Sequence, residues 1–444
     1  MKKRFKVLSI LLIFTMVVSI FAACGANDEN SNESSSEGSV EGEVDSGEEY
    51  TIHYLTAKSK EEGAVKAIEK VAAMYKEENP HFNFEVESIA DRTAYLQKLK
   101  ILASSDELPE MFDSDADSFF QELANAGQVA DVDKLYEDLD IVDTIYENAR
   151  NYQRMENDFL GLICWQANTE YFWYNKTCFE NAGITETPKT FEEFFEVCEK
   201  LKSADTTPIA LAGADSWPLL RYIAMIPFRE TGNTYIQKAI KGEESFGSET
   251  GIEAAEFIVE LAPYFQTGWN TADMATAVGL VTSGEAAIVY DGTWELPMFL
   301  NEDKTVKEDI GYFTLPTVGA NDVTTMSDYW AHAGIGTAIR ADAMDDNMMD
   351  FMKFVFENYA DISLYDFDIL PGMKTTVRDN TPAIYEELME NYSGVKDFAV
   401  CWDVVIDSAS NEVLVRETPN LAAGNITPEE WASRMDEAIK QNVN

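Results

Sequence analysis

The chain has 444 residues, enough for two or three domains, and its 80 acidic side chains far outnumber its 33 basic ones. The formal net charge of −47 argues against binding to nucleic acid or to an anionic membrane surface. It says little about a small ligand, because most surface charge is simply solvated. Only three His are present, and the Cys spacing matches neither a zinc site nor a CxxC pair, so no metal and no cofactor are expected.

Residues 1–23 have the pattern of a secretion signal, with four basic residues among the first six and an apolar stretch from 7 to 21. Small residues then lead into Cys24, as in a bacterial lipoprotein box, which predicts that Cys24 is lipidated and becomes the mature N-terminus. The alternative is an uncleaved anchor, but about fifteen apolar residues are short for a bilayer span. Residues 24–49 are acidic, contain no basic residue and have too few apolar side chains to fold, so they are predicted to be a disordered tether.

A globular pattern begins at Tyr50, where predicted strands start to alternate with predicted helices. The strands are expected at 50–55, 82–86 and 111–112, and the helices at 65–78, 95–105 and 118–126. Such alternation implies a mostly parallel sheet, and ligands bind beyond the carboxyl ends of its strands. The turns after Leu55 and Phe112 are therefore candidate cleft loops. The second turn carries Asp113 and Asp115, although Asp113 can equally be a cap-like turn residue.

One later stretch organises the second half of the chain. The apolar run Ala286–Tyr290 predicts a buried strand, Asp291 and Gly292 end it, and a short helix is expected from Trp294 to Phe299. A strand that ends in Gly at a helix N-terminus leaves free backbone N–H groups, which suit an anion or a hydroxyl-rich ligand. Trp294 adds a flat apolar face with a polar N–H. The alternative is a plain strand–turn–helix connection with Trp294 in the core.

Three capping boxes predict the N-termini of further helices, at Thr190–Glu193, Thr250–Glu253 and Thr427–Glu430. Apolar side chains at helical spacing between Met348 and Val355 predict a buried helix face rather than a binding site. Buried free thiols, or a disulfide such as Cys164–Cys178, are both compatible with the remaining cysteines, which are Cys164, Cys178, Cys198 and Cys401.

Two blocks of the sequence carry a family resemblance. The first, from Tyr75 to Val132, contains Leu108-Pro109-Glu110-Met111-Phe112, and the second, from Tyr171 to Phe194, contains Tyr171-Phe172-Trp173-Tyr174-Asn175-Lys176. With the stretch that ends Asp291-Gly292-Thr293-Trp294, they resemble the carbohydrate-binding group of extracellular solute-binding proteins, the receptors of bacterial ABC importers. The similarity runs with gaps from about Tyr50 to the C-terminus and is weakest after about Thr376. Leu162–Trp165 departs from the family, which usually has a Gly-Leu-Pro-like turn at this place.

The resemblance implies an α/β clamshell of the periplasmic-binding-protein type (type II-like), with two interleaved lobes joined by crossing hinge strands. The first lobe would contain residues 50–163 and 315–360, and the second residues 168–312 and 366–444. The hinges would lie near 162–169, 312–316 and 360–366. The implied molecule is a monomeric receptor, lipid-anchored on the extracytoplasmic face of the cell membrane. It would close on a carbohydrate, in particular an oligosaccharide, and deliver it to a membrane ABC permease.

No motif supports catalysis. The sequence lacks a Gly-x-Ser-x-Gly elbow, a His-Glu-x-x-His zinc motif and a phosphate-binding Gly-x-x-x-x-Gly-Lys loop. With 80 acidic residues, some carboxylates pair by chance, so their spacing cannot indicate a glycosidase. The alternatives are a surface-tethered glycan hydrolase or lyase, and a receptor of the same fold that binds a peptide, a polyamine or another solute.

A sugar presents hydroxyls to planar hydrogen-bonding side chains and apolar C–H faces to aromatic rings. Its cleft therefore needs Asp, Asn, Glu or Arg beside Trp or Tyr. Any single Trp is more often a core residue than a ligand platform, but several Trp in loops beside Asp or His, at positions that resemble the family's cleft, favour binding. The predicted ligand-binding residues are, in order, Trp294, Trp330, Trp165, Asp113, Trp217, Asp291, Asp115, His332, Arg378 and Trp402.

Overall fold

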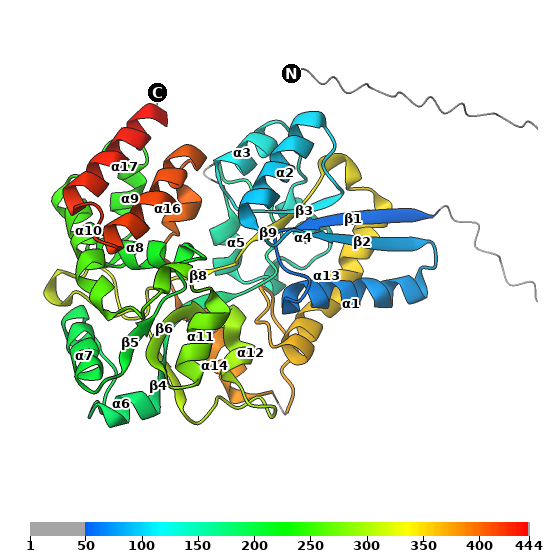
Figure 1. Ribbon diagram of the computed structural model, residues 1–444. Coiled ribbons are helices and arrows are strands. Elements are labelled where there is room, and N and C mark those ends of the chain that lie inside the picture. Colours follow the sequence, from blue (N-terminus) through cyan, green and yellow to red (C-terminus); the bar gives the residue numbers. More distant parts are fainter. Residues whose placement is uncertain (1–48, 156, 380, 443–444) are drawn as a thin grey trace, which may run out of the picture. The chain divides into compact units, whose positions relative to one another are not determined.

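Two β-sheets organise the part of the chain that the computed structural model describes, which is residues 49–155, 157–379 and 381–442 (Figure 1). The predicted secretion signal, Cys24 and nearly all of the predicted tether lie outside the described residues. The described residues belong to one compact unit. Within them, no helix combines the length and the apolar character that crossing a membrane would require.

The first sheet has the strand order β2-β1-β3-β9. Its three parallel strands are β1 (Tyr50–Thr56), β2 (Phe82–Ser88) and β3 (Met111–Ser114), which confirms the predicted strands, and β9 (Gly336–Ile339) is antiparallel to β3. Figure 1 shows α2 (Arg92–Ser105) and α3 (Ser118–Asn125) on one side of this sheet, and α1 (Gly63–Glu78) and α13 (Asp346–Phe367) on the other. The chain leaves α3 through α4 (Val132–Asp138), η1 (Val142–Thr144) and α5 (Glu147–Gln153).

The second sheet has the order β5-β6-β4-β7, and a short strand, β8, pairs with the start of β4. Its strands are β4 (Asn168–Asn175), β5 (Thr207–Ala210), β6 (Ala286–Gly292), β7 (Ile310–Phe313) and β8 (Ala331–His332). The run predicted as a buried strand is β6, and every residue in it is buried. The helices that precede β7 in this half are α6 (Lys176–Asn181), α7 (Phe191–Ser203), α8 (Trp217–Thr231), α9 (Thr234–Ala239), α10 (Glu249–Leu261), η2 (Ala262–Tyr264), η3 (Trp269–Thr271), α11 (Met274–Thr282), η4 (Thr293–Glu295) and α12 (Leu296–Phe299).

Further helices complete the molecule. They are η5 (Gly319–Asn321), η6 (Ala341–Ala343), α14 (Ala383–Gly394), α15 (Trp402–Val405), α16 (Ser408–Ala422) and α17 (Pro428–Asn442). Two of the three predicted capping boxes are confirmed. The Thr190 hydroxyl accepts a hydrogen bond from the N–H of Glu193 at the start of α7, and that of Thr427 accepts one from Glu430 at the start of α17. The third is wrong, because α10 begins at Glu249 after Ser248 and Thr250 lies inside its first turn.

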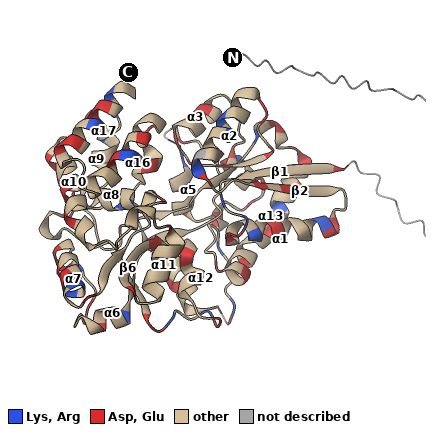
Figure 2. Ribbon diagram, in the orientation of Figure 1, with Lys and Arg blue, Asp and Glu red and all other residues tan. Residues whose placement is uncertain are grey.

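Apolar packing inside each half agrees with the sequence pattern. The helix face between Met348 and Val355 is buried, as predicted, and α13 packs against α1 below the first sheet. The four cysteines within the described residues are buried free thiols, so Cys164 and Cys178 are not joined. Figure 2 shows acidic side chains spread over many outer helices, including α7, α10 and α17. The charge pattern therefore does not single out a ligand site.

Three segments carry the chain between the two sheets, and they lie side by side. Ile163 pairs with Thr337 next to the first sheet, and Asn168 pairs with His332 at the second. The third segment follows α13 and lies against the first one, because the N–H of Gly372 donates to the carbonyl of Trp165. The passages between the sheets are therefore 163–169, 332–337 and 368–373.

The first passage agrees with the hinge predicted at 162–169, but the other two differ from the prediction. Residues 360–366 lie inside α13, which continues to Phe367, so the passage follows the helix. Residues 312–316 stay with the second sheet, because the buried guanidinium of Arg229 in α8 donates to the carbonyls of Leu315 and Pro316. Residues 315–330 thus lie with the second sheet and not, as predicted, with the first.

Candidate functional site

Five aromatic side chains form a continuous line beside the passages, and we call them the aromatic row: Phe398, Tyr152, His332, Trp294 and Trp217. Successive ring centroids lie 5.9, 5.4, 5.5 and 5.5 Å apart in this order. Tyr152 comes from α5 of the first half. The other four come from the second half: His332 from β8, Trp294 from η4, Trp217 from α8, and Phe398 from the loop between α14 and α15. Three of the predicted site residues, Trp294, Trp217 and His332, are therefore brought together, and both tryptophans are only partly buried.

The local sequence around Trp294 explains its orientation. β6 ends at Gly292, and the indole folds back over that glycine so closely that a Cβ there would lie 2.1 Å from the ring. Any larger residue at 292 would displace the indole. The next residue, Thr293, accepts a hydrogen bond from the N–H of Thr169 in the first passage, at 3.2 Å. The row is thus fixed to the place where the chain crosses between the sheets.

A cavity of about 610 Å³ adjoins the Tyr152–Phe398 end of the row. Its walls come from α3 and α5 of the first half, and from α9 and the segment 396–405 of the second. The polar side chains that line it include four amides, from Gln121, Asn151, Asn233 and Gln237. Asp117 also faces the cavity; burial, reinforced by the nearby Asp115, raises its pKa to about 6. Aromatic faces and planar hydrogen-bonding groups thus stand side by side, as a hydroxyl-rich ligand requires.

Four carboxyl groups, from Asp291, Glu295, Asp215 and Glu62, lie near the tryptophan end of the row. Burial raises the pKa of each of them. The negative charge of Glu295 raises the pKa of Asp291 further. The negative charges of Glu62 and Asp215 in turn raise the pKa of Glu295. Asp291 is completely buried; its Oδ1 accepts the N–H of Gly292 at 2.8 Å, and its Oδ2 has no partner among the described residues.

We expect Asp291→Asn to stabilise the protein at neutral pH. A carboxyl whose pKa is higher in the folded than in the unfolded chain costs stability as pH rises above its ordinary value of about 3.9. The amide keeps the acceptor for Gly292 and removes the buried charge, so the free energy of unfolding at pH 7.5 should rise by about 1–3 kcal/mol. Urea denaturation should show this gain shrinking towards pH 4.

The matched control is Asp303→Asn, whose exposed carboxyl has a lowered pKa because it accepts hydrogen bonds from Thr305. It should show no gain at pH 7.5. Equal or lower stability of Asp291→Asn at that pH would contradict the expectation.

Two predicted residues lie inside the first half rather than on a cleft wall. Asp113 has no exposed surface, and its carboxylate accepts hydrogen bonds from Tyr54, Thr56, Ala57, Lys58 and Thr337. Trp165 is buried against Tyr359, at 4.8 Å between ring centroids, and its indole N–H donates to the same Thr337 hydroxyl at 2.7 Å. Both are bound to the protein's own groups, and their role towards a ligand stays a prediction.

Three further predicted residues are not brought to the row. Trp330 is fully buried between Phe228 and Tyr290, and Trp402 packs against Tyr235 and Phe246. Both rings are enclosed by the protein's own side chains, and their role towards a ligand stays a prediction. Arg378 is exposed, pairs with Asp361 and stacks on Tyr365, and none of these neighbours belongs to the row. Asp115 forms an ion pair with Arg92, close to Asp117 and its cavity.

Sequence reasoning missed Tyr152, Phe398 and Glu170. Glu170 lies in β4, is completely buried, and its Oε1 is 3.0 Å from both the Nε of Arg221 and the Nε2 of His332. The one available signal was its position directly before the aromatic run 171–174, because a carboxylate in a buried strand must find a charged partner. Tyr152 and Phe398 carried no signal, since neither belongs to a motif.

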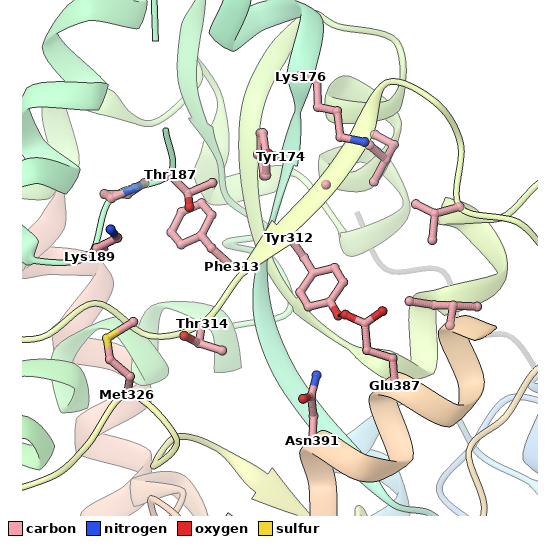
Figure 3. Close-up of a pocket in the computed structure, with 15 residues that line it drawn as sticks. Tyr174, Lys176, Thr187, Lys189, Tyr312, Phe313, Thr314, Met326, Glu387 and Asn391 are labelled. Atoms are coloured by element: carbon pink, nitrogen blue, oxygen red, sulfur yellow. The ribbon is translucent and has the colours of Figure 1, made fainter. Parts of the chain in front are cut away.

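A second cavity, of about 580 Å³, lies away from the row on the second sheet (Figure 3). It borders β7, the last strand of that sheet, and is lined by Tyr174, Tyr312 and Phe313. Figure 3 shows the Tyr312 hydroxyl pointing to the carboxylate of Glu387 in α14, to which it donates a hydrogen bond. No residue of the aromatic row lines this cavity.

Comparison with known proteins gives a consistent result. The family model described as bacterial extracellular solute-binding protein matches residues 57–360. The multiple sugar-binding protein of Streptococcus mutans is 26% identical over 340 residues, which cover 72% of this chain and 74% of that protein. The maltotriose-binding protein of Pyrococcus abyssi is 23% identical over 316 residues, which cover 68% of this chain and 64% of that one. A chitin oligosaccharide binding protein has the same fold, with a TM-score of 0.78 at 22% identity over 89% of this chain and 100% of that chain.

Proposed function

Because the chain belongs to the bacterial extracellular solute-binding proteins, we propose that it is the receptor of an ABC importer and captures an oligosaccharide between its two halves. The observation that carries this proposal is the aromatic row. Stacked sugar rings need apolar faces, and four rings of the row are partly exposed, which is more than one sugar needs; they are Phe398, Tyr152, Trp294 and Trp217, while His332 is buried among them. The sugar-binding names of the similar proteins support the same ligand class.

The two halves would act as the lobes of a clamp. We assign the first sheet with α1–α5 and α13 to one lobe, and the second sheet with α6–α12 and α14–α17 to the other. Ligand binding would close them by small rotations at the passages 163–169, 332–337 and 368–373. The permease would recognise the closed form, and lipidated Cys24 would hold the receptor, as a monomer, at the extracytoplasmic face of the membrane.

The test is a thermal-shift screen of the non-lipidated mature chain, residues 25–444, against mono- and oligosaccharides, peptides and polyamines. A ligand that binds only the native state raises the melting temperature by mass action. We expect an oligosaccharide to give the largest shift and to remain intact on incubation. A shift with polyamines alone would favour the carboxyl groups near Trp294 as the recognition element and overturn the carbohydrate. New glycan products would indicate a hydrolase or lyase.

We expect Glu387→Gln to leave oligosaccharide affinity unchanged within about twofold. Its carboxylate is exposed and lies at the cavity of Figure 3, which shares no residue with the aromatic row. Isothermal titration calorimetry measures the affinity, and the isosteric amide keeps a hydrogen-bond acceptor for Tyr312. A loss above tenfold would move the ligand site from the row to this second cavity.

A further inference from the structure

A closed circuit of contacts joins the two tryptophans of the aromatic row to one buried carboxylate. It runs from Glu170 to Arg221, Trp217, Trp294, His332 and back to Glu170. The Oε1 of Glu170 lies 3.0 Å from the Nε of Arg221 and 3.0 Å from the Nε2 of His332. The guanidinium carbon of Arg221 lies 5.3 Å from the centre of the Trp217 ring, and the His332 ring lies 5.5 Å from that of Trp294. The circuit closes at the contact of the two tryptophans, at 5.5 Å.

Glu170 is ionised at this position. Burial raises its pKa, but Arg221 and His332 more than offset this effect, so the pKa of Glu170 lies below its ordinary value. Hydrogen bonds to an ionised carboxylate are shorter and about twice as strong as those between neutral groups. Glu170 is 1% exposed, so its contacts are with its protein neighbours rather than with solvent.

Each arm of the circuit has a second attachment that leaves it a single orientation. In the first arm, Arg221 donates through Nη1 to Asp403 of α15 at 2.6 Å, so its guanidinium plane is fixed at two points. In the second arm, the Nδ1 of His332 accepts the N–H of Gly334 at 3.1 Å. Its Nε2 therefore carries the proton and donates to Glu170. Both ring nitrogens of His332 are engaged, and the ring cannot flip without breaking a hydrogen bond.

We propose that Glu170 is the positioning residue of the carbohydrate site. Through Arg221 and His332 it holds Trp217 and Trp294 in the orientation that a sugar chain contacts. This inference rests on the proposed function and names a residue that acts on the ligand through others. Glu170 follows the passage 163–169 directly, and His332 begins the passage 332–337. The circuit thus ties the aromatic row to two of the three segments at which the lobes would move.

The first experiment follows the fluorine resonances of labelled tryptophans in the absence of any ligand. Residues 25–444 are labelled with 5-fluorotryptophan, and the resonances of Trp217 and Trp294 are assigned from Trp→Phe variants. In Glu170→Gln we expect both resonances to shift and broaden, while that of Trp431, far along the chain, stays unchanged. His332→Phe should move Trp294 chiefly, and Arg221→Lys should move Trp217 chiefly, because each substitution opens one arm.

The matched control is Glu417→Gln. Glu417 is also a buried carboxylate held by two arginines, Arg416 and Arg434, but it lies in α16. Its loss should lower stability and affect Trp431, whose indole N–H donates to Thr418 beside it, at 3.2 Å. Trp217 and Trp294 should keep their resonances. If Glu170→Gln leaves these two resonances unchanged, or if it alters all tryptophans equally, the positioning role is overturned.

The second experiment measures affinity for the oligosaccharide found by the thermal-shift screen. Glu170→Gln should weaken it about tenfold, and Glu417→Gln should not weaken it. In a Trp217→Ala/Trp294→Ala background, Glu170→Gln should have little further effect on affinity, because the two tryptophans through which Glu170 acts on the ligand are absent. Full additivity would overturn the inference. Failure of the proposed function looks different: no saccharide binds the native protein, while the fluorine spectra still report whether Glu170 orients the tryptophans.

Discussion

Trp294→Ala weakens oligosaccharide binding by about 1–3 kcal/mol, and Trp217→Ala/Trp294→Ala weakens it by about 3–5 kcal/mol, if the aromatic row is the sugar platform. The indole of Trp294 lies at the centre of the tryptophan end, in contact with both His332 and Trp217. Its removal takes away one stacking face and leaves its neighbours without support. The two single effects should not add exactly, because the rings touch.

Isothermal titration calorimetry with the screened oligosaccharide measures these losses, and circular dichroism verifies that the fold persists. Both tryptophans are partly exposed, so their truncation creates no large internal void. The control is Tyr264→Ala, a partly buried aromatic residue beside Lys202 and outside the row. It should leave affinity unchanged. Affinity within twofold of the native value in the double variant would remove the row from the binding site.

The order of strands and helices in the first half followed from local patterns. Apolar and polar side chains alternate in β2, the helices have one apolar face, and both periodicities are visible within a few residues. The second half was harder, because β4, β6 and β7 pair across long stretches of sequence. The local sequence pattern also does not define where a long helix ends. α13 extends to Phe367 without a stop signal at 360, which displaced the predicted hinge.

The candidate site was only partly predictable for a physical reason. Trp294 and Trp330 have similar local sequences, each with an aspartate nearby, yet the first belongs to the row and the second lies in the core. Which face a tryptophan presents depends on the tertiary packing of distant segments, such as Phe228 on α8 against Trp330. Glu170 and His332 are 162 residues apart, so their contact could not be read from spacing.

Asp113→Asn is expected to lower the free energy of unfolding by about 3–5 kcal/mol, because it leaves a buried cation without its counter-charge. Lys58 is 6% exposed, and its ammonium lies 3.0 Å from the Oδ2 of Asp113. The other group bonded to that ammonium is the carbonyl of Ile335, at 3.1 Å. An amide keeps an oxygen for Tyr54 and Thr337. It puts an NH2 donor in place of Oδ2, which accepts from Thr56, Ala57 and Lys58, so the loss includes these hydrogen bonds as well as the charge.

Urea denaturation at pH 7.5, followed by circular dichroism, measures the loss. The double variant Lys58→Met/Asp113→Asn should recover most of it, since removing both charges of a buried pair costs far less than removing one. This outcome would establish that Asp113 joins β1, β3 and β9 of the first sheet. A ligand contact would then not be needed to explain why a carboxylate is buried at position 113. If Asp113→Asn instead keeps native stability and abolishes oligosaccharide binding, the carboxylate serves the ligand, and the first lobe contributes to the site through β3 as well as through Tyr152.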